Sequence, residues 1–462
     1  MAEENLLGLG EGFVYTINIV IGAGFLSIPI AFQSSGVVLS LFYLLILSIQ
    51  NIYLSIMFLD LSHRAKYLKA WKIEGSNYNL GIIQSIIKNK HLVIDREYPV
   101  IENISQLNAS EIFSLIFGSK FGYFFLISIT ISFEGALIAY VSIFASSFTS
   151  NIPLGDRNPC NIYETGLWSS CGVNYWIFLS IYAVIVIYLT FKGLKEQKSF
   201  QVTMCIMRFV IMSLIIICCF MAILREKEID SDEELKARPA LFEPTNSGKT
   251  IPIIIFALLY QLQLPSIAEL IKDKGKNLTR IVALIGVVSF FSYGALGIIV
   301  PFAIDDLRSE VSINFRNYSA GYNETNFAMQ FVSMVIVLFP AFDVISCFPL
   351  SSISLADNWK EMLYGKNEVP KSRDNLIKGL ISVFPVIIAF FTYDLGKILN
   401  IAGLLPLLNF NIVVPLAYIP MKAFCNFPSP FNLKYYNKNL NLLIALFNFS
   451  LLIYSLVKTL SD

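Results

Sequence analysis

Long apolar stretches separated by short polar ones dominate this sequence. A helix needs about 20 mostly apolar residues to cross the hydrocarbon core of a bilayer. Windows of that kind predict about eleven transmembrane helices, at 10–33, 37–60, 121–149, 175–191, 201–224, 250–271, 280–303, 327–354, 375–393, 396–420 and 439–457. These windows are too long for the strands of a membrane β-barrel, which run for about ten residues. The pattern predicts an all-α integral membrane protein.

The composition agrees with this prediction. Apolar residues make up 55% of the chain and charged residues 15%, whereas a soluble domain carries roughly 25% charged residues. The formal net charge of +1 gives no reason to expect a nucleic-acid partner. The expected partners are the lipid bilayer and a small-molecule substrate. The sequence does not indicate whether the protein is a monomer or an oligomer.

The distribution of basic residues predicts the orientation. With the N-terminus in the cytoplasm, 23 of the 34 Lys and Arg residues fall in cytoplasmic loops, as the positive-inside rule requires. Eleven spans then place the C-terminus on the extracytoplasmic side. There, Asn317 and Asn323 begin glycosylation sequons, and Cys160 and Cys171 share one loop in which a disulfide can persist.

The first span carries the most informative pattern. Gly22 and Gly24 lie at mid-membrane, and Pro29 follows five residues later, which predicts an interrupted helix. Carriers build substrate sites from such breaks, because half-helix N–H groups bind a carboxylate and unwound carbonyls bind a cation. The predicted substrate-binding residues here are Gly22, Ala23, Gly24 and Phe25. The alternative is a Gly-x-Gly at which two helices pack closely.

The sixth span carries a matching interruption before Pro265. Tyr260 and Gln261 lie beside it, and we expect both to contact the substrate, with Tyr260 as a gate. Two breaks five spans apart predict an inverted five-plus-five repeat. Repeat one covers about 10–224, repeat two about 250–420, and an extra helix about 439–457.

Several motifs resemble the amino acid/auxin permease family. They are Asn18-x-x-x-Gly22-x-Gly24 running on to Pro29-x-Ala31-Phe32, then Pro265 with Glu269-Leu270, Phe348-Pro349, and Asn409-Phe410 with Pro415 and Tyr418. The resemblance implies the LeuT-like fold and amino acid transport coupled to H⁺ or Na⁺. It also implies an ion site at Asn18 with an eighth-span hydroxyl, for which Ser346 is the candidate. The chain departs from the family at Asp343, an acid, and this favours H⁺.

Charged residues inside spans are costly, about 2.5–3.5 kcal/mol each on insertion scales. Glu134 in the third span is either a coupling carboxylate or a protonated packing residue, and Asp343 either binds the coupling ion or pairs within the bundle. Arg208 in the fifth span is expected to snorkel toward the cytoplasm. An inner gate formed by Arg208 and Glu269 is the alternative.

These observations favour a secondary active transporter of small, neutral amino acids over two rival classes. An amino-acid-sensing transceptor would need a docking segment, and only the loop from Leu61 to Lys120 offers one. An enzyme or metal protein is disfavoured, because His63 and His91 share that loop and no catalytic or Cys/His metal spacing occurs. The family works at plasma membranes and at vacuolar or endolysosomal membranes, and no motif decides between them.

Overall fold

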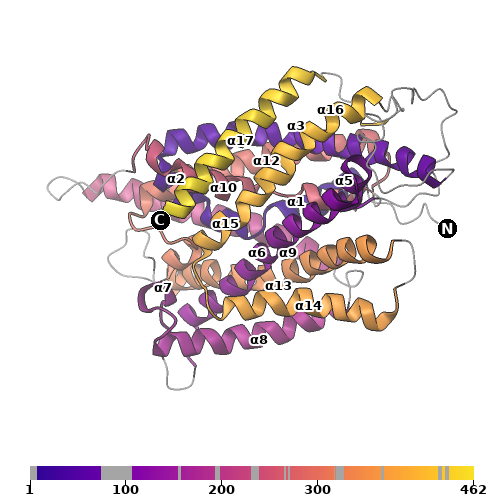
Figure 1. Ribbon diagram of the computed structural model, residues 1–462. Coiled ribbons are helices and arrows are strands. Elements are labelled where there is room, and N and C mark those ends of the chain that lie inside the picture. The colour runs from indigo at the N-terminus through magenta and orange to yellow at the C-terminus, as the bar shows by residue number, and fades with distance from the viewer. Residues whose placement is uncertain are drawn as a thin grey trace.

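The computed structural model describes residues 8–73, 107–154, 158–192, 198–229, 239–264, 267–268, 271–316, 318, 327–365, 369–424, 429–431 and 436–461. Within these ranges the chain forms helices and loops, without a β-sheet. Figure 1 shows them as an elongated bundle, in which α1 begins at one end and α17 finishes at the other. The prediction of an all-helical protein is confirmed.

The observed helices follow the predicted apolar windows closely. In chain order they are α1 (Leu9–Val20), α2 (Ile28–Ser35), α3 (Val37–Ile73), α5 (Ala109–Phe117), α6 (Ser119–Asn151), α8 (Ser170–Lys192), α9 (Lys198–Ile229), α10 (Ser247–Ala257), α12 (Lys274–Ala303), α13 (Phe327–Tyr364), α14 (Lys371–Ala389), α15 (Leu395–Pro406), α16 (Val414–Phe424) and α17 (Lys438–Ser461). The largest departures are α5, which has no predicted window, α10, which ends at Ala257 inside the window 250–271, and α3 and α13, which continue past their windows into polar sequence.

Eight segments of the described chain are long and apolar enough to cross a membrane. They are Val37–Lys69, Ser119–Asn151, Ser170–Lys192, Val202–Arg225, Gly275–Ala303, Phe327–Tyr364, Leu395–Ala423 and Lys438–Ser461. The other predicted spans fall on the broken pair α1–α2, on α10 and on α14. The chain is therefore a multi-pass membrane protein, while eleven crossings, the inverted repeat and the orientation of the termini stay predictions.

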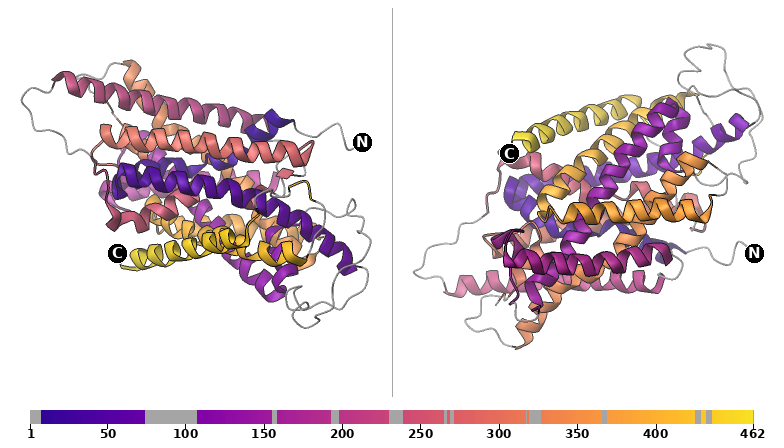
Figure 2. Two further views of the ribbon diagram at one scale, coloured as in Figure 1. Left: turned by 90° about the horizontal axis from the view of Figure 1, so that it is seen from above. Right: turned by 60° about the horizontal axis from the view of Figure 1, so that its bottom comes forward.

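Helix α6 is the central element of the bundle. It packs against α5, α8, α13, α14 and α15, and Figure 2 shows it among helices that come from both halves of the sequence. Glycine lets α15 approach α6 closely, because a Cβ added at Gly135 would lie 2.6 Å from the Cβ of Ala402. The core of the protein is thus assembled around one helix, which carries several buried polar residues.

The first and sixth predicted spans are both interrupted. Between α1 and α2 the chain leaves the helix at Ile21 and Gly22 and re-enters it through the 3₁₀ turn η1 (Ala23–Ser27). After α10 it unwinds at 258–260 and continues into the 3₁₀ turn η4 (Gln261–Gln263). The helix breaks expected from the glycines and from Pro265 are present.

A third interruption was not foreseen from the sequence. Between α15 and α16 the seven residues Leu407–Val413 form a π-helix, η6, directly after Pro406. Proline removes a backbone donor and displaces the preceding turn, and π segments are frequent at functional sites.

Of the two features predicted for the extracytoplasmic loops, the structure agrees with one and leaves the other open. Cys160 and Cys171 form a disulfide, with Cα atoms 5.8 Å apart, so that prediction is confirmed. Asn317 and Asn323 lie outside the described residues, and glycosylation at these sequons stays a prediction.

Candidate functional site

The two helix breaks lie directly against each other. Gly24, in η1, touches the last residue of α10: a Cβ added there would lie 2.6 Å from the Cα and 2.9 Å from the Cβ of Ala257. Real Cβ atoms do not come that close, so glycine is required at this contact. The predicted break and the alternative, close packing at the Gly-x-Gly, are therefore two aspects of one arrangement.

Side chains from neighbouring helices satisfy the backbone groups that the breaks set free. The Tyr293 hydroxyl of α12 lies 3.1 Å from the carbonyl oxygen of Val20 at the end of α1, and also 3.1 Å from that of Ala257 at the end of α10. The Asn51 amide of α3 donates to the carbonyl of Leu258 at 2.8 Å. Unpaired backbone groups in a membrane cost several kcal/mol each, so these contacts stabilise both interruptions.

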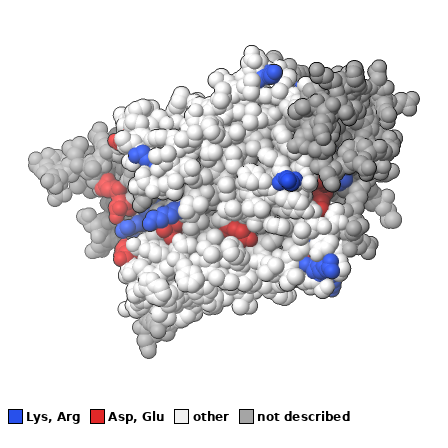
Figure 3. Space-filling view, viewed as in Figure 1, with Lys and Arg blue, Asp and Glu red and all other residues white. Residues whose placement is uncertain are grey.

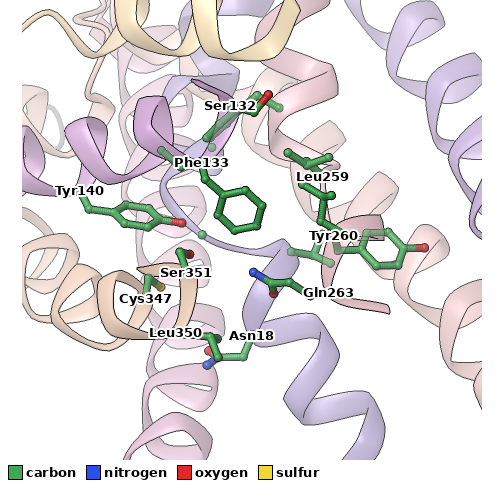
Figure 4. Close-up of a pocket in the computed structure, with 16 residues that line it drawn as sticks. Asn18, Ser132, Phe133, Tyr140, Leu259, Tyr260, Gln263, Cys347, Leu350 and Ser351 are labelled. Carbon is green, nitrogen blue, oxygen red and sulfur yellow. The ribbon is translucent and has the colours of Figure 1, made fainter. Parts of the chain in front are cut away.

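A small cavity of about 60 Å³ opens between the breaks. One water needs about 10–15 Å³ of such space, so the cavity has room for only a few non-hydrogen atoms. Its lining comes from four elements: Asn18, Val20, Gly22 and Gly24 of the first break; Ser132, Phe133, Ala136 and Tyr140 of α6; Phe256, Leu259, Tyr260, Leu262 and Gln263 of the second break; and Cys347, Leu350 and Ser351 of α13. Figure 4 shows the polar groups of Tyr140, Ser351, Gln263 and Asn18 around one space.

One of these polar groups lacks a protein partner. The side-chain oxygen of Gln263 is buried and has no hydrogen-bond partner among the described residues. A buried amide oxygen without a partner is destabilising by about 1–3 kcal/mol. A ligand with N–H donors in the cavity would remove that penalty.

A buried ion pair joins the fifth and eighth predicted spans beside the cavity. The Arg208 guanidinium lies 2.6–2.7 Å from Oδ1 of Asp343, and the two side chains are 1% and 2% exposed. Its Nη1 donates to the main-chain oxygen of Asn18, and its Nη2, which also contacts Asp343, donates to Sγ of Cys347 at 2.8 Å. Arg208 thus ties α1, α9 and α13 together next to the cavity.

This geometry corrects one expectation about side chains in the spans. Arg208 does not snorkel, because it is buried and its charge is matched by Asp343. The sulfur of Cys347 accepts a hydrogen bond from Arg208 and lines the cavity. Glu269, the expected gate partner of Arg208, lies outside the described residues.

The structure separates the predicted substrate residues into two groups. Asn18, Gly22 and Gly24 line the cavity, whereas Phe25 is buried in the core and is not part of that lining. The Ala23 backbone begins η1, and its side chain is outside the described set. Of the predicted substrate residues in the first span, the two glycines line the cavity and Phe25 does not, and substrate contact stays a prediction.

At the second break the predicted residues also divide. Tyr260 lines the cavity, but its ring points away from Tyr140 and Ser351 in Figure 4, so its side chain does not stand as a gate. Gln261 turns toward α3 and donates to the Asn51 side chain. Gln263, two residues on, takes the place in the lining that was expected for Gln261.

The two remaining coupling candidates lie apart from the cavity lining. The Ser346 hydroxyl donates to the main-chain oxygen of Asp343 at 2.8 Å. Glu134 is on α6 but lines a separate apolar groove against α14 and α15. Of the four predicted coupling residues, Asn18 alone lines the cavity.

Sequence reasoning missed Tyr140, Ser351 and Tyr293. Each sits in an apolar window where an aromatic or a serine is usually a packing residue, and the apolar periodicity does not distinguish them. Their positions at the site become apparent only once the two helix breaks, α6, α12 and α13 are seen packed together.

A polar strap covers the extracytoplasmic side of the breaks, by the predicted orientation. It is the loop at 304–316, which includes the 3₁₀ turn η5 (Val311–Phe315). Glu310 in this strap is fully buried, and its carboxylate accepts from the hydroxyls of Ser146 at 2.6 Å, Ser147 at 2.8 Å and Ser312 at 3.1 Å. Burial raises the pKa of Glu310 to about 7, and the three hydrogen bonds act against that rise.

The strap also holds the second half of the first broken helix. The hydroxyl of Ser27, in η1, donates to the main-chain oxygen of Ser309 at 2.6 Å. The Ser309 hydroxyl in turn donates to Asp394 at 3.3 Å, and Asp394 caps α15 through the amides of Gly396 and Lys397. These contacts tie η1, the strap and the start of α15 together. No group of three or more His, Cys, Asp or Glu side chains capable of holding a metal occurs in the described part of the chain.

Known proteins resemble this chain along nearly its whole length. The family profile of transmembrane amino acid transporter proteins matches residues 7–461. Transmembrane protein 104 of Homo sapiens is 22% identical over 436 residues, which cover 87% of this chain and 85% of the relative. The Transmembrane protein 104 homolog of Dictyostelium discoideum is 24% identical over 442 residues, with coverage of 87% and 86%.

Solved structures share the fold. The Eremococcus coleocola manganese transporter, in complex with an aromatic bis-isothiourea substituted compound, superposes with a TM-score of 0.56 at 13% identity. The match covers 98% of this chain and 86% of that one. At this identity the likeness shows a transporter fold alone. From the family profile, which spans almost every residue, the chain belongs to the family of transmembrane amino acid transporter proteins.

Proposed function

We propose that this protein is a secondary active carrier of small, neutral amino acids, driven by H⁺. The observation that carries the proposal is the cavity between the two helix breaks. Gln263 lines this cavity, and its buried side-chain oxygen has no hydrogen-bond partner among the described residues. The start of η1 offers backbone N–H groups to a carboxylate. Gln263 and the unwound carbonyls offer acceptors to an ammonium group.

The size and the lining of the cavity favour a small apolar side chain. Phe133, Phe256 and Leu262 supply apolar wall, and the space of about 60 Å³ is tight. None of the lining residues carries a formal charge, so a charged substrate side chain would have no counter-ion there. An amino acid of the size of glycine or alanine fits this description.

The Arg208–Asp343 pair supports H⁺ rather than Na⁺ as the driving ion. The guanidinium already joins the main-chain oxygen of Asn18 on α1 to a carboxylate on α13, the two helices to which the family resemblance assigns the ion site. A fixed positive charge there takes the place of a bound cation. When α1 moves and the pair opens, Asp343 becomes the acceptor for a proton.

Proteoliposomes containing the full chain test the proposal. Uptake of labelled glycine or alanine would be followed under an inward H⁺ gradient, an inward Na⁺ gradient, or neither. Accumulation driven by the H⁺ gradient and abolished in Asp343→Asn, but not in the half-buried loop control Glu243→Gln, supports the assignment. A thermal melt of Asp343→Asn with its ligand distinguishes lost coupling from lost folding.

Two other outcomes would overturn parts of the proposal. Accumulation that requires Na⁺ and persists in Asp343→Asn would remove H⁺ coupling. Ligand-induced thermal stabilisation without accumulation under any gradient would favour the transceptor, which senses amino acids with little transport.

A further inference from the structure

A second, larger hollow lies on the side of the bundle, away from the cavity between the breaks. It is a groove of about 850 Å³ between α6, α13, α14 and α15, within the 300–1,000 Å³ range of small-molecule pockets. Its walls are mainly Ile, Leu and Phe side chains, among them Ile131, Leu380 and Phe384. We call this hollow the lateral groove.

The lateral groove contains a carboxyl group that the protein leaves unsatisfied. Glu134 lines the groove and is 7% exposed, and its Oε2 is buried with no hydrogen-bond partner in the described chain. Glu134 lies halfway along α6, far from either end of a 33-residue helix. An unpaired acid at mid-membrane is unfavourable by several kcal/mol when ionised.

Three other polar side chains of the groove already have partners. The Trp359 indole of α13 donates to the Thr130 hydroxyl at 2.9 Å. Lys397, at the start of α15, is 84% exposed and lies 3.8 Å from Asp394. Figure 3 shows this face as largely uncharged, with most of its Lys, Arg, Asp and Glu side chains toward the two ends.

We propose that the lateral groove binds a lipophilic amine, whose chain fills the apolar walls and whose nitrogen pairs with the Glu134 carboxyl. An acyl chain alone would fill the walls and leave the acid without a partner. An alcohol would give it one neutral hydrogen bond. A neutral amine that enters from the membrane accepts the proton of the carboxylic acid, and the resulting ammonium–carboxylate pair makes charge-assisted hydrogen bonds about twice as strong.

This site is independent of the proposed transport function. It uses the face of α6 formed by Thr130, Glu134 and Ile138, one turn apart from each other. The transport cavity uses Ser132, Phe133, Ala136 and Tyr140 of the same helix. One helix therefore separates two sites of different chemistry.

Trp359 provides a reporter inside the groove itself. The chain has four tryptophans, and replacing Trp71, Trp168 and Trp176 by Phe leaves Trp359 as the single fluorophore. Thr130, which Trp359 contacts, is one helical turn, about 5–6 Å along the axis, from Glu134. Bromine atoms on a chain bound at Glu134 would quench this fluorescence.

The test uses the full chain in lipid nanodiscs at neutral pH. Two probes are titrated, a mid-chain dibrominated dodecylamine and the matching dibrominated dodecanol. We expect the amine to quench Trp359 at a concentration at least about tenfold lower than the alcohol, which is about 1.4 kcal/mol. Glu134→Gln should abolish the difference between the probes, and Glu243→Gln, a control in a loop outside the groove, should preserve it.

Leu380→Phe gives a second test that leaves the acid untouched. Leu380 lies in the wall and is 64% exposed, so a larger ring narrows the groove with little effect on folding, and both probes should bind severalfold more weakly. Equal quenching by the two probes in the parent protein would overturn the proposal. An amine preference that survives Glu134→Gln, or quenching that both variants leave unchanged, would overturn it as well.

Discussion

Two acids in the membrane-spanning helices, Asp343 and Glu134, have opposite surroundings. Asp343 faces a guanidinium at hydrogen-bond distance, and Arg208 extends this contact to α1 and to Cys347. Glu134 faces an apolar groove, and one of its oxygens has no partner in the described structure. Both were candidates for ion coupling on the sequence alone, because both were acids inside apolar windows.

The difference lies in what each acid does for the fold. A buried pair is balanced only while both partners remain, so Asp343 and Arg208 hold each other and the first broken helix in place. Oε2 of Glu134 has no hydrogen-bond partner among the described residues and lines a groove that a ligand can enter. Glu310 is an intermediate case, because it is fully buried but bound by three neutral hydroxyls. We expect the stability of the fold to depend most on Asp343, less on Glu310 and least on Glu134.

Breaking the buried pair should have the largest effect. Arg208→Met or Asp343→Asn alone should destabilise the protein by about 3–5 kcal/mol, because each leaves an uncompensated charge or a vacant donor set. The double variant Arg208→Met/Asp343→Leu should recover much of that loss. Thermal unfolding in detergent, followed by near-ultraviolet circular dichroism, measures both. A double variant as unstable as the sum of the single variants would show that the residues do not act as a pair.

The strap should make stability depend on pH through Glu310. Its pKa rises from 4.5 to about 7 on folding, so the folded state binds the proton more tightly than the unfolded state. The resulting stabilisation is complete below about pH 4.5 and is lost as pH rises to about 7, with a total near 3 kcal/mol. Melting temperatures at pH 5 and pH 8 should differ less in Glu310→Gln than in the parent.

Tyr163, Asp394 and Arg308 also carry titratable or charged groups near the strap, so their contribution must be separated from that of Glu310. Asp394→Asn serves as the matched control. If this variant loses the pH dependence and Glu310→Gln keeps it, the assignment to Glu310 is wrong.

The Tyr293 hydroxyl at the two helix breaks should contribute less to stability. Tyr293→Phe keeps the ring and removes the hydroxyl that lies beside the Val20 and Ala257 carbonyls, and we expect a loss of about 1–2 kcal/mol. The neighbouring exposed aromatic Phe291, 68% exposed, offers Phe291→Leu as a control of little effect. Equal melting temperatures for Tyr293→Phe and the parent would show that the hydroxyl does not support the breaks.

Replacing Glu134, the acid in the lateral groove, should have the smallest effect on stability. Glu134→Gln keeps the shape and takes away an unpartnered carboxyl, so the change should be within about 1 kcal/mol and can be favourable. The same melts measure it in the absence of added amine. A loss comparable with that of Asp343→Asn would mean that Glu134 is held by the fold, and the contrast between the two acids would fail.

The sequence predicted the elements well and the site only in part. Hydropathy located the helices, and Gly22, Gly24 and Pro265 located the breaks, because glycine and proline act through the local backbone. The pairing of Arg208 with Asp343 joins residues 135 positions apart, and Gln263 rather than Gln261 reaches the cavity because of how the chain unwinds. Both features depend on tertiary packing, which the hydrophobic periodicity of a sequence does not predict. The π segment after Pro406 was missed because a proline alone does not decide whether a helix is interrupted, and Pro385 lies inside the continuous helix α14.

The most direct test of the central claim, that the cavity at the two breaks carries a small amino acid, is counterflow in proteoliposomes. Vesicles preloaded with unlabelled alanine would be diluted into labelled alanine without any ion gradient. Two glycine variants form a matched pair: a Cβ at Gly24 meets Ala257 at 2.6 Å, whereas a Cβ at Gly294 meets only side chains at 3.5 Å or more. We predict transient accumulation of label in the parent and in Gly294→Ala, and none in Gly24→Ala. Counterflow that is equal in both variants, or absent from the parent, would contradict the account.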